Sequence, residues 1–286
     1  MNTVKMDPAM RCGAVRLVVR DLDRSLRYYQ GRIGLRLLRN EDRTAALGAN
    51  ESELLTLVEQ PDALPVQRGR TGLYHFALLT PDRVALSRVL NHLIATQTPI
   101  DGASDHGVSE ALYLSDPDGH GIEIYRDRPQ REWPFVKGSL GMTTDPLDVR
   151  GLAAADRTRT PWEGIDPRTM MGHIHLHVAN LAAAERFYVD LLGLDLMQRF
   201  GGQAAFVSAG GYHHHLGLNT WAGIGAPPPP KSAARLLDFQ LIVPDSTILM
   251  RIIEQLQFFG IEANTTADGW SVLDPSGNRI LLNHLG

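Results

Sequence analysis

Three histidines alternate with apolar residues in the run His173-Ile174-His175-Leu176-His177-Val178. Successive side chains of a β-strand point to opposite faces, so a strand here would place all three imidazoles on one face. The apolar residues between them would then face a helix layer. An isolated histidine that points inward is more often a hydrogen-bonded structural residue. Three on one face also suit metal binding or proton transfer.

A second histidine cluster follows in the same half of the chain, in Tyr212-His213-His214-His215-Leu216. Its place in the pattern predicts a position on the third strand of the same structural unit. The alternative is a polar edge strand without a chemical role, and a triple histidine alone does not decide between the two.

The first half of the chain carries a further set of candidate residues. His75 lies in an expected strand, His106 in a loop, and Tyr113 and Glu123 in the third and fourth strands of their unit. Glu123 has an isoleucine on each side, so its carboxylate points to the opposite face. There it is either a solvated strand residue or a ligand.

Two neutral imidazoles and one carboxylate form a donor set with a definite metal preference. On one side of a divalent iron they leave several coordination positions open for substrate and oxygen. A closed structural zinc site would favour thiolates, and the chain has a single cysteine, Cys12. One thiol makes no internal disulfide, which fits a reducing cytoplasm.

The elements that position these residues come from a repeated unit. Residues 19–35 recur in a matching pattern at residues 178–194, and the turn Asp116-Pro117-Asp118-Gly119 recurs as Asp274-Pro275-Ser276-Gly277. Long-range repetition of this kind indicates a fold assembled from copies of one unit. The expected modules, numbered one to four, span residues 12–60, 72–127, 171–222 and 236–284.

Each module reads as a strand, a helix and three more strands, which predicts an α+β fold of four βαβββ modules. Asp21 and Asn180 are suitable N-caps for two of the helices, and Gly34 and Gly193 suit their C-terminal ends. We expect two domains of two modules each, residues 1–127 and 171–286. A linker, residues 128–170, would join them.

These motifs resemble the vicinal oxygen chelate (glyoxalase/bleomycin resistance/dioxygenase) superfamily, and within it the catechol 2,3-dioxygenases. The resemblance covers nearly the whole chain. It rests on Gly172-His173-Ile174, Phe187-Tyr188 with Leu192-Gly193, His213-His214-His215-Leu216, Asp105-His106-Gly107, and Tyr113-Leu114-Ser115-Asp116-Pro117-Asp118-Gly119 with Glu123. It implies two vicinal oxygen chelate domains whose sheets curl around cavities.

Carried over position by position, the resemblance implies that His75, Glu123 and His173 are metal ligands. Enzymes of this kind usually build the site inside the C-terminal pair of modules, but here module four has no ligands. Its histidine, tyrosine and glutamate positions hold Asp238, Ser271 and Leu281. Module one has Ala14 where the first-strand histidine would stand. Modules two and three are therefore expected to share one site, within one chain or between two chains of a dimer.

The resemblance also implies an extradiol ring-cleaving dioxygenase with Fe(II) as cofactor and a catechol-like aromatic diphenol and O₂ as substrates. His214 would be the acid–base residue, and Tyr113 and His106 would hydrogen-bond the substrate oxygens. Three alternatives on the same scaffold stay open. They are a hydroquinone ring-cleaving dioxygenase, a glyoxalase-like or thiol-transfer metalloenzyme, and a metal-free protein that binds aromatic compounds.

The composition limits the remaining function classes. The 286 residues are 43% hydrophobic and 21% charged, as in ordinary globular proteins. The net charge of −4 offers no basic field for nucleic acid or an acidic membrane. No apolar run reaches the ~18 residues of a membrane span, and the N-terminus lacks a signal-peptide core. We expect a cytoplasmic enzyme that acts on a small molecule and has no nucleic-acid or membrane partner. The sequence is also compatible with a homo-oligomer.

Overall fold

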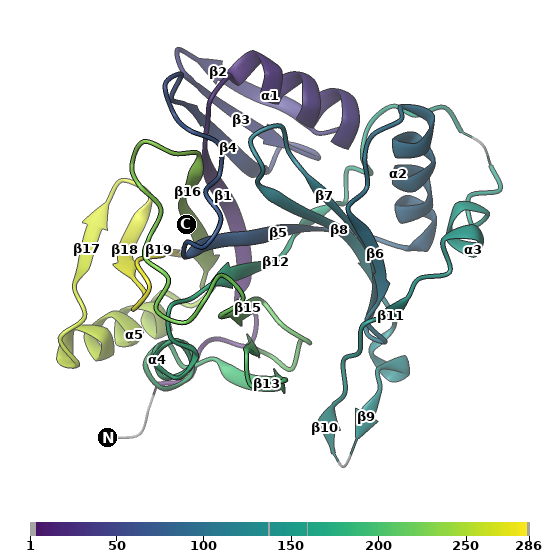
Figure 1. Ribbon diagram of the computed structural model, residues 1–286. Helices are drawn as coiled ribbons and strands as arrows, with labels where there is room; N and C mark the ends of the chain where they lie inside the picture. Colours follow the sequence, from purple (N-terminus) through teal and green to yellow (C-terminus); the bar gives the residue numbers. More distant parts are fainter. Residues whose placement is uncertain (1–3, 137, 159, 285–286) are drawn as a thin grey trace.

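The computed structural model describes residues 4–136, 138–158 and 160–284 and contains two large β-sheets (Figure 1). All four predicted modules are present, each with one strand, a helical segment and three further strands. The predicted α+β class and the fourfold βαβββ repeat are therefore confirmed. No helix in the described part of the chain is long and apolar enough to cross a membrane.

The modules follow one another along the chain. Module one contains β1 (Arg11–Val19), α1 (Leu22–Tyr28), η1 (Tyr29–Ile33), β2 (Arg36–Glu41), β3 (Thr44–Gly48) and β4 (Glu53–Glu59). Module two contains β5 (Gly72–Thr80), α2 (Arg83–Ala95), β6 (Gly102–Asp105), β7 (Ser109–Ser115) and β8 (Gly121–Asp127). Module three contains β12 (Met170–His177), α4 (Leu181–Glu185), η3 (Arg186–Leu191), β13 (Asp195–Phe200), β14 (Ala204–Ser208) and β15 (Leu216–Asn219). Module four contains β16 (Arg235–Ile242), α5 (Ser246–Phe258), β17 (Ala263–Thr266), β18 (Gly269–Leu273) and β19 (Arg279–Asn283).

The segment between modules two and three has short elements of its own. They are η2 (Gln130–Glu132), β9 (Phe135–Val136), β10 (Ser139–Leu140), β11 (Asp145–Pro146) and α3 (Val149–Ala153). β11 pairs with β6 and so extends one edge of a sheet. The predicted linker is therefore partly built into the structure of module two.

Each sheet takes one module from each half of the chain. The nine-stranded sheet has the order β11-β6-β7-β8-β5-β12-β15-β14-β13 and joins modules two and three. The eight-stranded sheet, β17-β18-β19-β16-β1-β4-β3-β2, joins modules one and four. The junctions are the antiparallel pairs β5–β12 and β1–β16. The expected halves, 1–127 and 171–286, thus do not correspond to separate sheets.

Local sequence explains the ends of the first and third helical segments. The side chains of Asp21 and Asn180 accept hydrogen bonds from the third backbone N–H after them, as predicted N-caps. Gly34 and Gly193 follow the π-helical turns η1 and η3 at φ of 85° and 80°, a conformation that favours glycine.

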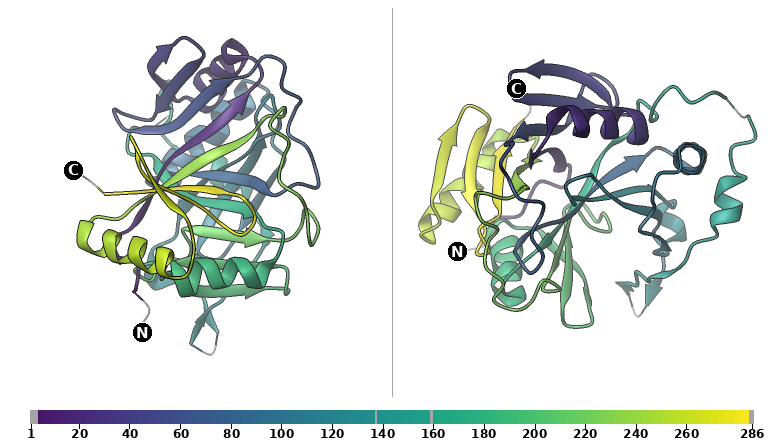
Figure 2. Two further views of the ribbon diagram at one scale, coloured as in Figure 1. Left: turned by 90° about the vertical axis from the view of Figure 1, so that its left-hand side faces the viewer. Right: turned by 45° about the horizontal axis from the view of Figure 1, so that its top comes forward.

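Buried tyrosines attach module one to module two and module three to module four. Tyr29 in η1 donates to Asp116 of the module two turn at 2.9 Å, and Tyr188 in η3 donates to Asp274 of the module four turn at 3.1 Å. The side chain of Gln255 in α5 also donates to the carbonyl of Leu191, and Figure 2 shows α5 beside this helical segment. Modules one and two, and modules three and four, therefore contact through helices and turns, while modules two and three, and modules one and four, pair through strands.

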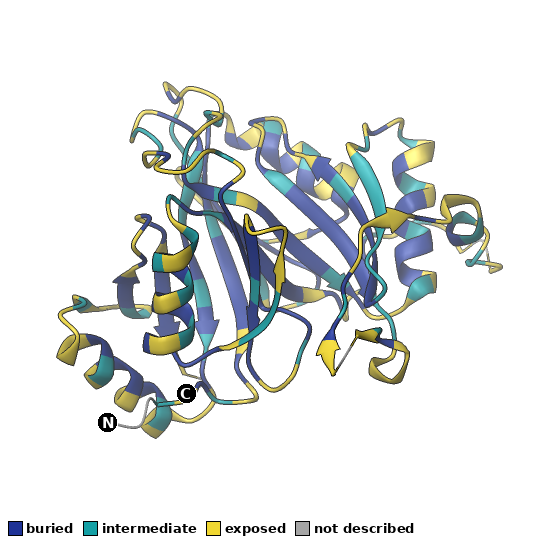
Figure 3. Ribbon diagram, turned by 60° about the horizontal axis from the view of Figure 1, so that its bottom comes forward, coloured by how far each residue is buried: buried dark blue, intermediate teal, exposed yellow. Residues whose placement is uncertain are grey.

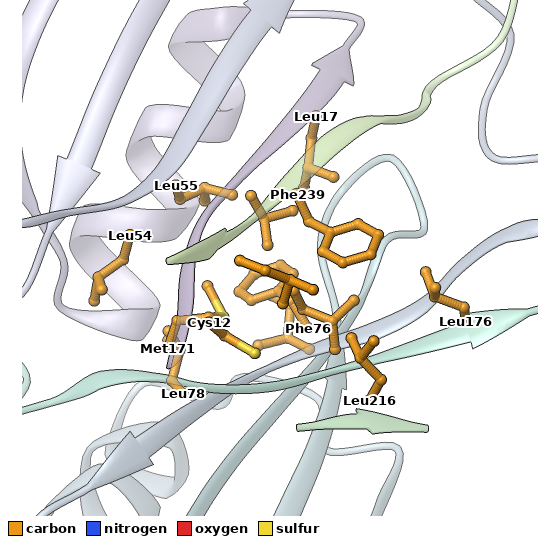
Figure 4. Close-up of a cluster of buried hydrophobic side chains, with 14 of the residues drawn as sticks. Cys12, Leu17, Leu54, Leu55, Phe76, Leu78, Met171, Leu176, Leu216 and Phe239 are labelled. Carbon is orange, nitrogen blue, oxygen red and sulfur yellow. The ribbon is translucent and has the colours of Figure 1, made fainter. Parts of the chain in front are cut away.

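The main hydrophobic core lies between the two sheets (Figure 4). Leu17 and Phe239 from one sheet and Phe76, Leu176 and Leu216 from the other are fully buried there. Figure 3 shows buried residues concentrated along the strands and exposed residues on the outer sides of the helices. Burial of this apolar area is the dominant favourable term in the folding free energy. Because the core takes the apolar residues of β12, its histidines face the other side of the sheet.

Candidate active site

A cavity of about 580 Å³ opens on the face of the nine-stranded sheet that carries the histidines. Its wall includes side chains from β5, β7, β8 and β12 and from the loop before β15. This volume is within the range of small-molecule sites. His75, His106, Tyr113, Glu123, His173 and His214 all line it. The structure therefore brings all six residues singled out from the sequence to one cavity.

Strand register brings the three expected ligands together. Ala77 of β5 lies beside Glu123 of β8 on one side and beside His173 of β12 on the other. His75 precedes Ala77 by two residues, so its side chain is on the same face of β5. The three residues that modules two and three are expected to share therefore lie next to one another within a single chain.

The donor atoms of these residues converge. His75 Nε2 is 3.0 Å from Glu123 Oε2 and 3.3 Å from His173 Nε2, and His173 Nε2 is 3.1 Å from Glu123 Oε2. Ligands at about 2.1 Å from an ion and at right angles to one another would be roughly 3.0 Å apart. The residues present therefore fit a divalent cation that keeps neighbouring positions open, as the two-histidine, one-carboxylate donor set predicts. In the described residues this is the only such group of three His, Cys, Asp or Glu side chains.

Burial and mutual contact shift the pKa values of Glu123 and His173. Burial by itself raises the pKa of Glu123, but His173 and His75 outweigh it and hold that pKa well below the usual range. Burial lowers the pKa of His173, against the opposing effect of Glu123. A carboxylate beside neutral imidazoles is the form that binds a metal. His173 Nδ1, which in a metal ligand usually donates to a second group, has no hydrogen-bond partner among the described residues.

Tyr113 and His106 form a hydrogen-bonded pair at the cavity wall. Tyr113 OH is 2.6 Å from His106 Nε2, and His106 Nδ1 is 2.7 Å from the carbonyl of Thr143. Because a carbonyl only accepts, Nδ1 carries the ring proton, and Nε2 accepts from the tyrosine. Burial, followed by the charge of Glu123, raises the pKa of Tyr113 well above its usual value. The phenol oxygen keeps a lone pair free for a substrate hydroxyl.

His214 lies in the turn between β14 and β15, so the predicted third-strand position of the triple histidine was wrong. Gly210 and Gly211 in this turn have φ of 64° and 73°, which breaks the strand before the histidines begin. His214 is buried with its ring centroid 4.2 Å from that of His173. Burial is the largest cause that lowers its pKa well below 6.5, so the ring is neutral.

His175 is a cavity residue to which the sequence motifs gave no role. Its side chain is buried, it lines the cavity, and its Nε2 has no hydrogen-bond partner among the described residues. The ring lies over Gly217 of β15, where a Cβ would be 2.7 Å from two of its atoms. The strict alternation of the histidines was the signal that placed His175 on this face. Tyr74 and Trp221, with ring centroids 5.3 Å apart, continue the wall.

Among the residues that the structure describes, the corresponding face of the eight-stranded sheet has no matching donor set. Asp238 is buried there and pairs with Arg16 at 2.6 Å, and Leu281 is buried at the expected glutamate position. Modules one and four, which lack the expected ligands, thus pair with each other, as modules two and three do.

Comparison with known proteins identifies the family to which this architecture belongs. The family model of the Glyoxalase/Bleomycin resistance protein/Dioxygenase superfamily matches residues 11–124 and 170–282. The chain belongs to this superfamily. A relative in Bacillus subtilis (strain 168), named catechol-2,3-dioxygenase, is 43% identical over 273 residues, which cover 92% of this chain and 93% of the relative.

Two solved structures agree with the architecture. Glyoxalase I from Zea mays matches with a TM-score of 0.58 and 18% identity, over 96% of this chain and 92% of that chain. The cppA protein from Streptococcus pneumoniae TIGR4 matches with a TM-score of 0.56 and 12% identity, over 99% of each chain. At these identities the likeness shows the fold alone.

Proposed function

We propose that this protein is an Fe(II)-dependent extradiol dioxygenase that cleaves the ring of a catechol-like diphenol with O₂. The observation that carries the proposal is the buried set His75, Glu123 and His173, whose donor atoms are 3.0–3.3 Å apart at the cavity wall. The 43% identity to a relative named catechol-2,3-dioxygenase supports the same activity. Among divalent ions, Fe(II) is the one for which this donor set with open positions is typical.

The three ligands would hold the metal from three neighbouring strands, so the sheet fixes their relative positions. Bound there, Fe(II) would supply chelation of the two diphenol oxygens and electron transfer to O₂. The protein supplies the remaining functions: it binds and orients the ring, and it holds and moves protons. Positioning both reactants in one site lowers the entropic part of the barrier.

His214 is the proposed acid–base residue. Its neutral ring can take a proton from a substrate hydroxyl and return it later. The Tyr113–His106 pair is proposed to accept a hydrogen bond from the second hydroxyl, since the tyrosine proton is already donated to His106. The aromatic rings of Phe206, Tyr74 and Trp221 form an apolar wall for the substrate ring.

Anaerobic reconstitution tests the function. Metal-free protein would be loaded with Fe(II) and assayed by oxygen uptake with a panel of catechols, hydroquinones and 2-oxoaldehydes. We expect oxygen uptake with catechols and a yellow hydroxymuconic semialdehyde type product. Full activity on a 2-oxoaldehyde with zinc alone, or diphenol binding without oxygen uptake, would replace the proposal with the metalloenzyme or the binding-protein alternative.

A further inference from the structure

A chain of hydrogen bonds runs from His214 away from the cavity to a carboxylate. His214 Nδ1 is 2.8 Å from His213 Nδ1, and His213 Nε2 is 2.8 Å from Asp127 Oδ1. The other oxygen of Asp127 accepts from Tyr212 at 2.9 Å, and the hydroxyls of Tyr212 and Tyr125 are 2.7 Å apart. The proposed function uses only the first member of this chain.

The partners determine where the protons lie along the chain. An ionised carboxylate only accepts, so His213 donates its Nε2–H to Asp127. A neutral imidazole has one N–H, which leaves His213 Nδ1 as an acceptor. His214 must then donate from Nδ1, and its own Nε2 is left without a proton.

The hydrogen-bond chain shares strand β8 with one of the expected metal ligands. Asp127 is the last residue of β8 and lies four residues after Glu123, on the same face of the strand. His213 is fully buried, with ring centroids 4.0 Å from Tyr212 and 5.3 Å from Trp133. His214 is hydrogen-bonded to His213, so the packing that fixes His213 also holds His214 beside His173.

We propose that Asp127 and His213 are positioning residues that hold His214 in the tautomer with an unprotonated Nε2, ready to act as a base. The inference rests on the proposed function, because it gives that base a substrate hydroxyl to act on. When the hydroxyl O–H bond breaks, an N–H bond forms at His214 Nε2, and the Nδ1 proton stays hydrogen-bonded to His213. The carboxylate at the far end then stabilises the positive charge, as the aspartate does for the histidine of hydrolase triads.

The substitution Asp127→Asn separates this role from a structural one. The amide keeps the shape of the side chain, but its nitrogen donates to His213 Nε2 while its oxygen still accepts from Tyr212. His213 would then carry its proton on Nδ1 and donate to His214, which would force the His214 proton onto Nε2. In hydrolase triads the same change leaves the geometry intact and lowers kcat by about 10⁴-fold through the wrong tautomer.

The direct readout is the tautomer of His214 in metal-free protein, measured by long-range ¹H–¹⁵N correlations of the imidazoles. We expect the proton on Nδ1 in the wild type and on Nε2 in Asp127→Asn. Tyr212→Phe is the matched control, because it removes a hydroxyl from Asp127 and leaves the bond to His213; its tautomer should equal that of the wild type. A proton on Nε2 in the wild type, or the same tautomer in Asp127→Asn, overturns the proposal.

A kinetic readout on the Fe(II)-loaded enzyme complements the spectra. In Asp127→Asn, kcat should fall roughly 10²–10⁴-fold with KM and iron content nearly unchanged, while Tyr212→Phe stays within a few-fold of the wild type. His213→Phe, which removes the acceptor without supplying a donor, should also lower kcat. A loss confined to KM or iron content contradicts the positioning role. If the wild type cleaves no diphenol but the spectra agree, the dioxygenase proposal fails and the tautomer assignment holds.

Discussion

His214 and His75 lie in the same cavity but are proposed to do different chemistry, which separates their expected mutant phenotypes. His75→Ala removes a ligand and should lose most of the iron together with activity. His214→Ala should keep the iron and lose about 10²–10⁴-fold in kcat, the usual contribution of a general acid–base group. Iron content by metal analysis and kcat by oxygen uptake measure the two effects separately. Equal iron loss in both variants would make His214 a metal ligand and contradict its role.

His215, which follows His214 in the chain, has a structural environment and should affect stability at acid pH. Burial lowers its pKa to about 4, and its Nδ1 accepts from the Ala209 N–H and lies 2.8 Å from Ser208 Oγ. Between pH 6.5 and about 4 the unfolded chain binds a proton that the folded protein does not, so folding stability falls as the pH is lowered through this window. Above pH 6.5 this contribution to stability is fully present.

The substitution His215→Asn keeps an acceptor at that position and removes the titration. We therefore expect the wild type to lose more unfolding free energy than His215→Asn between pH 7 and pH 5, by about 2 kcal/mol, at 1.36 kcal/mol for each pH unit and proton. Urea denaturation at both pH values measures the difference. Identical losses in the two proteins would show that His215 is not the residue that titrates.

At the scale of elements, the contact of β12 with β15 depends on one residue without a side chain. Gly217 pairs with His175 in this parallel ladder, and a Cβ on it would overlap the imidazole. Gly217→Ala should lower the free energy of unfolding by about 1–3 kcal/mol, the usual cost of overpacking.

A double-mutant cycle with His175→Ala tests the cause of that loss. If steric overlap with the imidazole is responsible, the two substitutions together should destabilise less than the sum of their separate effects. Additive effects, measured by urea denaturation, would instead assign the loss to the backbone of β15.

Sequence reasoning worked best for features that depend on short stretches of chain. The alternation in residues 173–178 predicted both faces of β12, and the repeated Asx caps and glycines predicted the ends of the helical segments. The pairing of β5 with β12 is a long-range contact that no local pattern sets. It followed only from the complementary ligands of modules two and three, seen through the family resemblance.

Other features were out of reach because they depend on special backbone conformations or on side chains brought together from distant segments. The turn that holds His213–His215 depends on two left-handed glycines, so strand alternation misplaced it. The contacts of Asp127 with Tyr212 and His213 join residues 85 and 86 positions apart in the sequence. Asp127 and Tyr212 lie outside the motifs of the family resemblance, and the hydrogen bonds became visible only with the fold.

At the scale of the whole molecule, the proposed metal site connects the two halves of the chain. His75 and Glu123 come from the first half and His173 from the second, and all three are in strands at or next to the β5–β12 junction. An unfolded chain would not hold these donors together, so a metal that binds them binds the folded state. Metal binding should therefore stabilise the fold across the junction.

We expect Fe(II), under anaerobic conditions, to raise the free energy of unfolding by about 2.7 kcal/mol at a free concentration a hundred times its Kd. The increment should vanish in His173→Ala, which removes the only ligand from the second half. Asp238→Asn is the matched control, because Asp238 occupies the equivalent first-strand position in the eight-stranded sheet. It should change the stability of the metal-free protein, through its pair with Arg16, and leave the Fe(II) increment intact. Urea denaturation of the three proteins with and without Fe(II) decides the point. An increment that survives in His173→Ala would mean that the metal is held by one half alone, and an increment lost in Asp238→Asn would place the metal in the other sheet.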